Sequence, residues 1–153
     1  MNTATAIDLG TVSHGTMRSE DLIPCFRSVL SDLDRNTNEY TVLLLDAMML
    51  TDYDSDEAQY IWEELADALN ELAPSHCYFG AHEGDGSDYG FWPDWDSIRD
   101  DIHDGELLCV DDRGNSDTIP DDYNGEWVHS NDHGNVTLYV RKNGQDTEIW
   151  AIV

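Results

Sequence analysis

The residue types best suited to chemistry gather in a glycine-rich segment, residues 78–93, that also carries acids, a histidine and aromatic side chains. Four candidate metal ligands come from this segment and from a later predicted turn: His82, Glu83, Asp85 and His133. Carboxylate oxygens suit Ca²⁺ or Mg²⁺, and histidine with carboxylate suits zinc or iron. One hypothesis is therefore a metal-dependent enzyme that uses these side chains. The alternative is a hairpin-like structural loop, in which glycines supply positive φ angles while Phe91 and Trp92 pack on the core.

Established catalytic spacings are missing from the sequence. It has no EF-hand loop, HExxH zinc motif, GxSxG nucleophile turn or GxGxxG phosphate loop. Ser13 and His14 are neighbours in sequence, but adjacency says nothing about a catalytic triad in space. The sequence therefore predicts a protein that is not an enzyme and that needs neither a cofactor nor a bound metal.

Charge is the strongest signal: 33 Asp and Glu against 7 Lys and Arg give a net charge of −26 over 153 residues. A chain this acidic has no broad basic face, which excludes direct binding to nucleic acid or to an anionic membrane. Basic proteins, cations or concentrated salt are the natural counterparts. The acids concentrate in the middle of the chain. Residues 32–72 carry net −11 and residues 83–122 net −12, whereas residues 1–31 and 126–153 carry −1 and −2.

Within these two blocks the acids recur at helical spacing. The first set occupies the arc opposite the apolar stripe of a helix predicted over 56–72, with no Lys or Arg among them: Asp56, Glu57, Glu63, Glu64, Asp67 and Glu71. The second set lies on and just after a helix predicted over 95–103: Asp96, Asp100, Asp101 and Asp104. Like-charged neighbours at i,i+4 each cost an isolated helix about 0.2–0.5 kcal/mol, so the pattern needs an explanation.

Two explanations of the acids compete. In the first, they replace DNA phosphates and accept charge-assisted hydrogen bonds in the basic groove of a nucleic-acid-binding protein. In the second, the chain is a salt-adapted (halophilic) structural or interaction protein, whose self-repulsion is screened because the Debye length is about 3 Å at 1 M salt. Adaptation spreads charge over every exposed surface, whereas mimicry concentrates it. The near-neutral ends of the chain favour mimicry, so we predict a DNA mimic that inhibits a host defence or regulatory protein.

Apolar periodicity predicts the elements that position these groups. Four helices are expected, over 19–34, 40–50, 56–72 and 95–103, with Ser19, Asp54 and Asp94 as caps of the first, third and fourth. The second is apolar on almost every side and is expected to be the central core helix, with a buried strand over 41–45 as the alternative. Period-two alternation predicts strands over 77–81, 107–111, 126–129, 135–141 and 148–153. The expected fold is α+β, with N-terminal helices packed on a mostly antiparallel C-terminal β-meander, in a single domain spanning 1–153.

Three runs of the chain, Val12–Pro24, Tyr78–Pro93 and Asn131–Tyr139, resemble small acidic proteins of unknown function from phages, plasmids and other mobile elements. The resemblance extends over most of the chain. It implies a mobile-element setting, in which acidic proteins that block host DNA-binding defence systems are a known type. It implies no site residues, and the three runs fall largely outside the densest acid helix, so mimicry rests on the charge pattern alone.

Signals for export and membrane insertion are missing. The first residues lack a basic segment followed by an apolar run, so no signal peptide is predicted. The most apolar stretch, 42–50, has nine residues and is far shorter than a membrane span. The cysteines Cys25, Cys77 and Cys109 are isolated in sequence, which indicates reduced thiols. A cytoplasmic protein is therefore expected, and a homodimer stays open.

Overall fold

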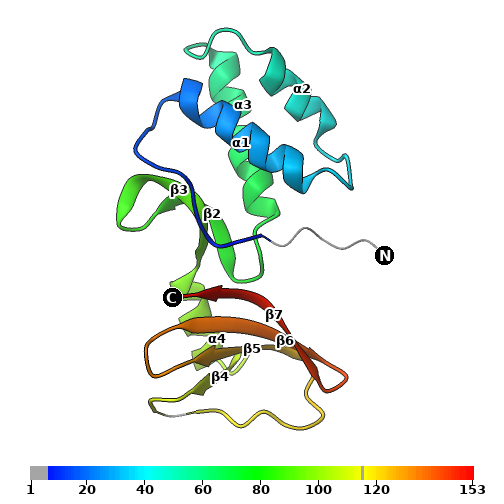
Figure 1. Ribbon diagram of the computed structural model, residues 1–153, viewed down its shortest axis with the longest axis vertical. Helices are drawn as coiled ribbons and strands as arrows, with labels where there is room; N and C mark the ends of the chain where they lie inside the picture. Colours follow the sequence, from blue (N-terminus) through cyan, green and yellow to red (C-terminus); the bar gives the residue numbers. More distant parts are fainter. Residues whose placement is uncertain (1–6, 115) are drawn as a thin grey trace. The chain divides into compact units, whose positions relative to one another are not determined.

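Figure 1 shows the computed structural model of the chain, which describes residues 7–114 and 116–153. The chain divides into two compact units. The helical unit runs to Ala73 and includes Tyr78–Trp92, and the sheet unit comprises Pro74–Cys77 and Pro93–Val153. That these units together form a single domain stays a prediction.

The helical unit contains three helices and a small sheet. The helices are α1 (Ser19–Leu33), α2 (Thr41–Met49) and α3 (Asp56–Glu71). The sheet has the order β1–β3–β2, formed by Gly10–Ser13, Asp85–Pro93 and Cys77–His82. In Figure 1, α1 crosses α3 and α2 lies beside both. Since β1 pairs antiparallel with β3, the beginning of the chain is joined to the segment that follows α3.

The core of the helical unit joins one side of α1 and of α3 to the small sheet. Its buried side chains include Leu22, Ile23, Phe26 and Leu30 of α1, Ala58, Ile61, Leu65, Ala68 and Leu69 of α3, and Phe79, Tyr89 and Phe91 of the sheet. The ring of Phe26 lies at the centre, with centroid distances of 5.1 Å to Phe79, 5.6 Å to Tyr89 and 5.9 Å to Trp62. Aromatic pairs of this kind add about 0.5–1.5 kcal/mol each beyond area burial, so the cluster holds α1 and α3 firmly against the sheet.

The sheet unit contains α4 (Trp95–His103) and a four-stranded sheet of order β4–β5–β6–β7. Its strands are Leu108–Asp111, Gly125–Ser130, Val136–Lys142 and Gln145–Ile152, in that order. β4 pairs parallel with β5, and β5, β6 and β7 form an antiparallel meander. Val128, Leu138 and Trp150 stand opposite one another across three strands and are buried. The Trp150 ring meets that of Trp95 at 6.4 Å, which places α4 on this face of the sheet.

The predicted α+β class, with N-terminal helices and a mostly antiparallel C-terminal sheet, is confirmed. The helices end within one residue of their predicted limits, and Asp94 caps α4 by accepting a hydrogen bond from the Ser97 N–H at 3.1 Å. Two other predicted caps are wrong. Ser55 rather than Asp54 caps α3, and the cap position of α1 falls on Arg18, whose side chain makes no cap hydrogen bond.

α2 is a helix, not a strand, but it is not the central core helix that its composition predicted. Ala47 is its one buried residue, while Val42 and Met49 are 73% and 75% exposed. A helix that is apolar on every side carries no information about which side faces the core, and α1 and α3 cover only one side of α2. Among the residues that the structure describes, no helix combines the length and apolarity of a membrane span.

Candidate functional site: the acidic face of α3

α3 positions the first predicted set of acids. The helix begins after Ser55, whose hydroxyl accepts a hydrogen bond from the Ala58 N–H at 3.1 Å. Asp56 and Glu57 occupy its first turn, where free backbone N–H groups stabilise negative charge. Because the apolar stripe of α3 is buried in the core, the helix has a fixed rotation about its axis, and the opposite arc faces solvent.

The six acids lie on this solvent-facing arc. Glu64 is half-buried and the other five are exposed. Among the described residues, none of the six forms an ion pair with Lys, Arg or His. Two accept hydrogen bonds from neutral donors: Glu63 from the Gln59 amide at 2.9 Å, and Glu71 from the Tyr40 hydroxyl at 3.0 Å. The arc is therefore an ordered array of carboxylates without a bound cationic side chain.

The charge of this face acts on Tyr40, which ends the α1–α2 connection. Burial of the phenol, its hydrogen bond to Glu71 and the nearby charges of Glu71, Glu39 and Asp34 raise the pKa of Tyr40 to about 12. Tyr40 therefore keeps its proton throughout the neutral range and serves as a donor that orients the Glu71 carboxylate.

Asp67 lies at the centre of the like-charge contacts on α3. Glu63 and Glu71 are four residues away on either side and Glu64 is three residues away, so three repulsive pairs meet at Asp67. Each such pair costs a helix about 0.2–0.5 kcal/mol. A partner that brings Lys or Arg side chains to this arc would relieve the repulsion as it binds.

The second predicted set, on α4 and just after it in the sheet unit, is partly engaged by neighbouring side chains. Asp96 pairs with Arg99, and Asp101 lies 3.4 Å from the Nδ1 atom of His76. The two that are exposed and without an ion pair in the described part of the chain are Asp100 and Asp104. This set therefore offers fewer uncompensated carboxylates than the acidic face of α3.

A polar network around His76 in the sheet unit had no local sequence signal. The ring lies between two carboxylates, because its Nε2 atom is also 3.0 Å from Glu126. The Ser75 hydroxyl donates a hydrogen bond to the same Glu126 at 2.8 Å. Ser75 is thus engaged by an acid rather than by the imidazole, so the arrangement is not a nucleophile–base pair. It ties residues 74–77 to α4 and β5.

Asp85, one of the four candidate metal ligands, is occupied by contacts within the helical unit. One carboxylate oxygen accepts hydrogen bonds from the N–H and the hydroxyl of Ser87, at 3.0 and 2.8 Å, and the other lies 3.2 Å from His14 Nε2. The Ser87 bonds hold the pKa of Asp85 below its ordinary value. These contacts close the turn at the beginning of β3.

The other two candidates of the helical unit, His82 and Glu83, do not gather around Asp85. The Nδ1 atom of His82 accepts a hydrogen bond from the Gly84 N–H at 2.9 Å, and its ring meets Trp92 edge-on at 4.7 Å. Glu83 is exposed beside it, and His133 belongs to the sheet unit. Within residues 7–114 and 116–153, no three His, Cys, Asp or Glu side chains are grouped so that they could hold a metal ion. A metal-dependent enzyme stays a prediction that this geometry does not support.

The alternative prediction for residues 78–93, a hairpin-like loop, is confirmed in its outline and wrong about its glycines. The segment forms β2 and β3, joined at residues 83–84, and none of its glycines has a positive φ. Phe91 is buried, as predicted. Gly90 is required for a different reason: a Cβ atom there would lie 2.0 Å from the Gly10 carbonyl oxygen, so its absence lets β1 approach β3.

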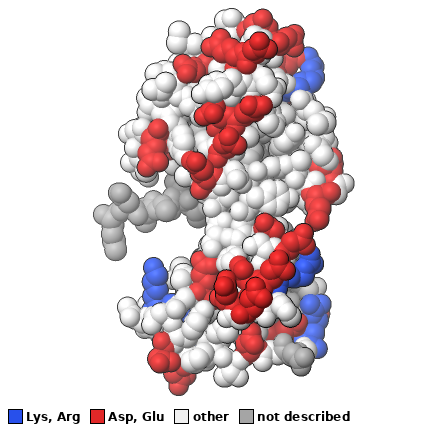
Figure 2. Space-filling model, turned by 180° about the vertical axis from the view of Figure 1, so that it is seen from behind, with Lys and Arg blue, Asp and Glu red and all other residues white. Residues whose placement is uncertain are grey.

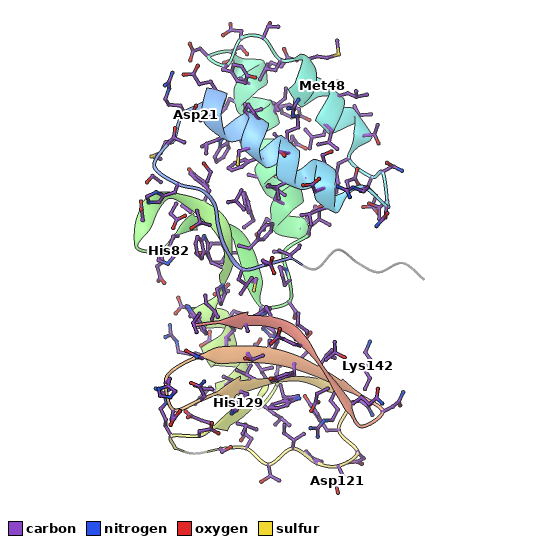
Figure 3. All side chains as sticks on the ribbon, in the orientation of Figure 1. Asp21, Met48, His82, Asp121, His129 and Lys142 are labelled. Atoms are coloured by element: carbon purple, nitrogen blue, oxygen red, sulfur yellow. The ribbon has the colours of Figure 1, made fainter. Side chains whose placement is uncertain are left out.

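Exposed apolar side chains beside the acidic face were missed in the sequence. On α2 they are Val42, Leu45, Met48 and Met49, and Tyr60 stands among the acids on the outer arc of α3. Met48 is labelled on α2 in Figure 3. The position of Tyr60, four residues from both Asp56 and Glu64, was the available signal, because this spacing places it on the acidic arc.

Comparisons of the chain with models of protein families, with curated proteins and with solved structures find no match. Its function is therefore inferred from its own geometry.

Proposed function

We propose that the protein is an acidic binding protein that occupies the basic groove of a nucleic-acid-binding protein, with α3 in place of a DNA strand. The observation that carries the proposal is the acidic arc of α3. Six carboxylates share one side of a helix whose other side is fixed in the core, and no cationic side chain among the described residues pairs with them. Each carboxylate can accept a charge-assisted hydrogen bond from Arg or Lys.

The spacing of these carboxylates supports the comparison with DNA. Asp56 and Glu71 are 15 residues apart, which corresponds to roughly 22 Å at a helical rise of about 1.5 Å per residue. One strand of B-DNA carries a phosphate every 3.4 Å or so along the axis, hence about six or seven over this length. The six acids of α3 therefore match the linear charge density of one strand.

The energetic cost of the arc is a second argument for a role in binding. Neutral polar residues at the same positions would avoid the repulsion at Asp67 and keep the helix equally well hydrated. Surfaces that lower stability in this way are typical of functional sites. The array also attracts a basic partner over a distance and so raises the rate of association.

Salt adaptation is the second candidate, and the distribution of acids between the units favours it. The helical unit has 18 acids and three basic residues, and the sheet unit has 15 acids and four basic residues. Figure 2 accordingly shows carboxylate side chains on the visible face of both units, including a strip across the helical unit in the upper part of the view. Denaturation in increasing NaCl or KCl distinguishes the candidates, because unfolding below about 1 M salt indicates adaptation.

The proposal places the protein in the cytoplasm, where Cys25, Cys77 and Cys109 would persist as the free thiols that they are in the structure. An inhibitor of a host defence or regulatory protein also suits the mobile-element setting that the resemblance implies. The partner is then a basic nucleic-acid-binding protein, and the chain itself contacts neither nucleic acid nor membrane.

Charge reversal on α3 tests the proposal. The triple variant Glu63→Lys, Asp67→Lys and Glu71→Lys should lose capture of the basic partner from host lysate, with an unchanged far-UV circular dichroism spectrum. The matched control is Asp8→Lys, Asp122→Lys and Glu148→Lys, three exposed acids outside both predicted sets. Both variants change the net charge from −26 to −20, so equal capture by the two variants would show that only total charge matters.

A further inference from the structure

α2 exposes an apolar ridge that the fold of the helical unit leaves uncovered. The ridge consists of Val42, Leu45, Met48 and Met49. Tyr60, on the outer arc of α3, is 60% exposed. Single exposed apolar residues are common on protein surfaces, but a group of five on two adjacent helices is typical of a protein–protein contact. Methionine suits such a surface, since its flexible side chain adapts to the partner.

A groove of about 320 Å³ lies between α2 and α3. Of the ridge residues, Val42 lines this groove, whereas Leu45 and Met48 line the groove between α1 and α2. The apolar lining of the α2–α3 groove comes from Val42, Leu43, Tyr60 and Ala68. Its charged lining consists of acids alone: Glu39, Asp46, Glu64, Asp67 and Glu71. The groove therefore combines an apolar surface with an acidic one, which is more than an array of phosphate surrogates requires.

We infer that this groove binds a basic amphipathic α-helix of the partner protein. Apolar side chains of that helix lie against Val42, Met49 and Tyr60, and its Lys and Arg side chains face the groove acids. The inference rests on the proposed function and deepens it, because Glu64, Asp67 and Glu71 belong to the acidic face of α3.

Charge complementarity selects a basic occupant, and the apolar lining selects one with an apolar side. An amphipathic helix meets both requirements, because apolar residues at i, i+3, i+4 and i+7 form one face and basic residues flank it. A basic chain without such a face would satisfy the acids and leave the ridge in water. α2 and α3 have nine and 16 residues, so they can support a partner helix of roughly 14–24 Å.

Other occupants fit this groove less well. A second copy of the chain would bring the same five acids against one another across a two-fold axis. The sheet unit also carries a net negative charge, with 15 acids against four basic residues. The larger groove of about 620 Å³ between α1 and α2 does not select a charge, because Arg27 and Arg35 line it together with Asp32 and Asp34.

Two synthetic peptides test the inference with the full chain. Both peptides have 18 residues and the same numbers of Leu and Lys. In one, the Leu residues recur with a period of 3.6 and form an apolar helix face. In the other, the order is scrambled so that no apolar face forms. Fluorescence anisotropy should show that the wild-type chain binds the amphipathic peptide at least about tenfold more tightly than the scrambled one. The double variant Val42→Ser and Met49→Ser should bind the amphipathic peptide about tenfold more weakly than the wild-type chain does. Its affinity for the scrambled peptide should be unchanged.

Met17→Ser provides the matched control, because Met17 is 67% exposed and does not line the groove. It should bind both peptides as the wild type does. Equal wild-type affinity for the two peptides, or an unaltered affinity in the double variant, would overturn the groove inference, while the charge-reversal experiment would still decide the role of the acidic face. A dimer detected by sedimentation velocity and lost in the double variant would overturn it too, by assigning the ridge to a second copy.

Discussion

Neutralising Asp67 should make the helical unit more stable and the protein a weaker binder. In Asp67→Asn, the three repulsive pairs with Glu63, Glu64 and Glu71 disappear together, and each costs about 0.2–0.5 kcal/mol. The expected gain in the free energy of unfolding is therefore about 0.6–1.5 kcal/mol at low ionic strength. Asn and Asp have similar helix propensities, so intrinsic preference does not account for a gain of this size.

Urea denaturation followed by circular dichroism measures this change, and native-state hydrogen exchange of the α3 amides assigns it to the helix. In 1 M salt, where the Debye length is about 3 Å, most of the gain should vanish. Asp8→Asn is the control, since Asp8 is exposed and lies outside the two acid sets. A stability that is unchanged or lower in Asp67→Asn at low salt would refute the idea that the acidic arc is a strained, uncompensated array.

Three further changes test the structure that positions the face. Ser55→Ala removes the cap of α3 and should lower the free energy of unfolding by about 1 kcal/mol in urea denaturation. Asp34 is 3% exposed and accepts three hydrogen bonds; burial raises the pKa of this carboxyl, but the bonds outweigh burial and hold it below its ordinary value. Its stabilising effect is therefore complete above the ordinary pKa of about 3.9 and is lost as pH falls through the lowered value. Asp34→Asn should lower the free energy of unfolding by about 1–3 kcal/mol at neutral pH and should make it fall less steeply as the pH is lowered. An unchanged decrease of stability at acidic pH would contradict this role. Gly90→Ala should detach β1 from β3 at a cost of about 1–3 kcal/mol, seen as faster hydrogen exchange of the amides in the β1–β3 pair. Gly86→Ala should not have this effect, because a Cβ there meets nothing within 4 Å.

The acidic face of α3 could be predicted because helical periodicity determines both of its sides. Once Ile61 and Leu65 are assigned to the core, the 3.6-residue period places Glu63 and Asp67 toward solvent, and the structure has them there. The same reasoning predicted α4 and its cap at Asp94. These features depend on residues close together in the sequence.

Features that depend on distant segments could not be predicted in this way. The glycines of residues 78–93 weakened the strand signal, but pairing with β1, about 80 residues earlier in the chain, stabilises β3. Asp101 was expected to be free, yet it lies beside His76, which arrives from the connection between α3 and β2. α2 shows the complementary difficulty: its apolar residues exceed what α1 and α3 can cover, and composition alone does not say which of them stay exposed.

We propose that a basic nucleic-acid-binding protein recognises the acidic face of α3 as it recognises DNA. Affinity capture from the lysate of the native host, repeated with duplex DNA as competitor, tests it most directly. We predict that one basic protein is retained by the wild-type chain, is released by DNA, and is not retained by the Glu63→Lys, Asp67→Lys, Glu71→Lys variant. A partner that stays bound in excess DNA, or that the triple variant retains as well as the wild type does, would contradict the claim.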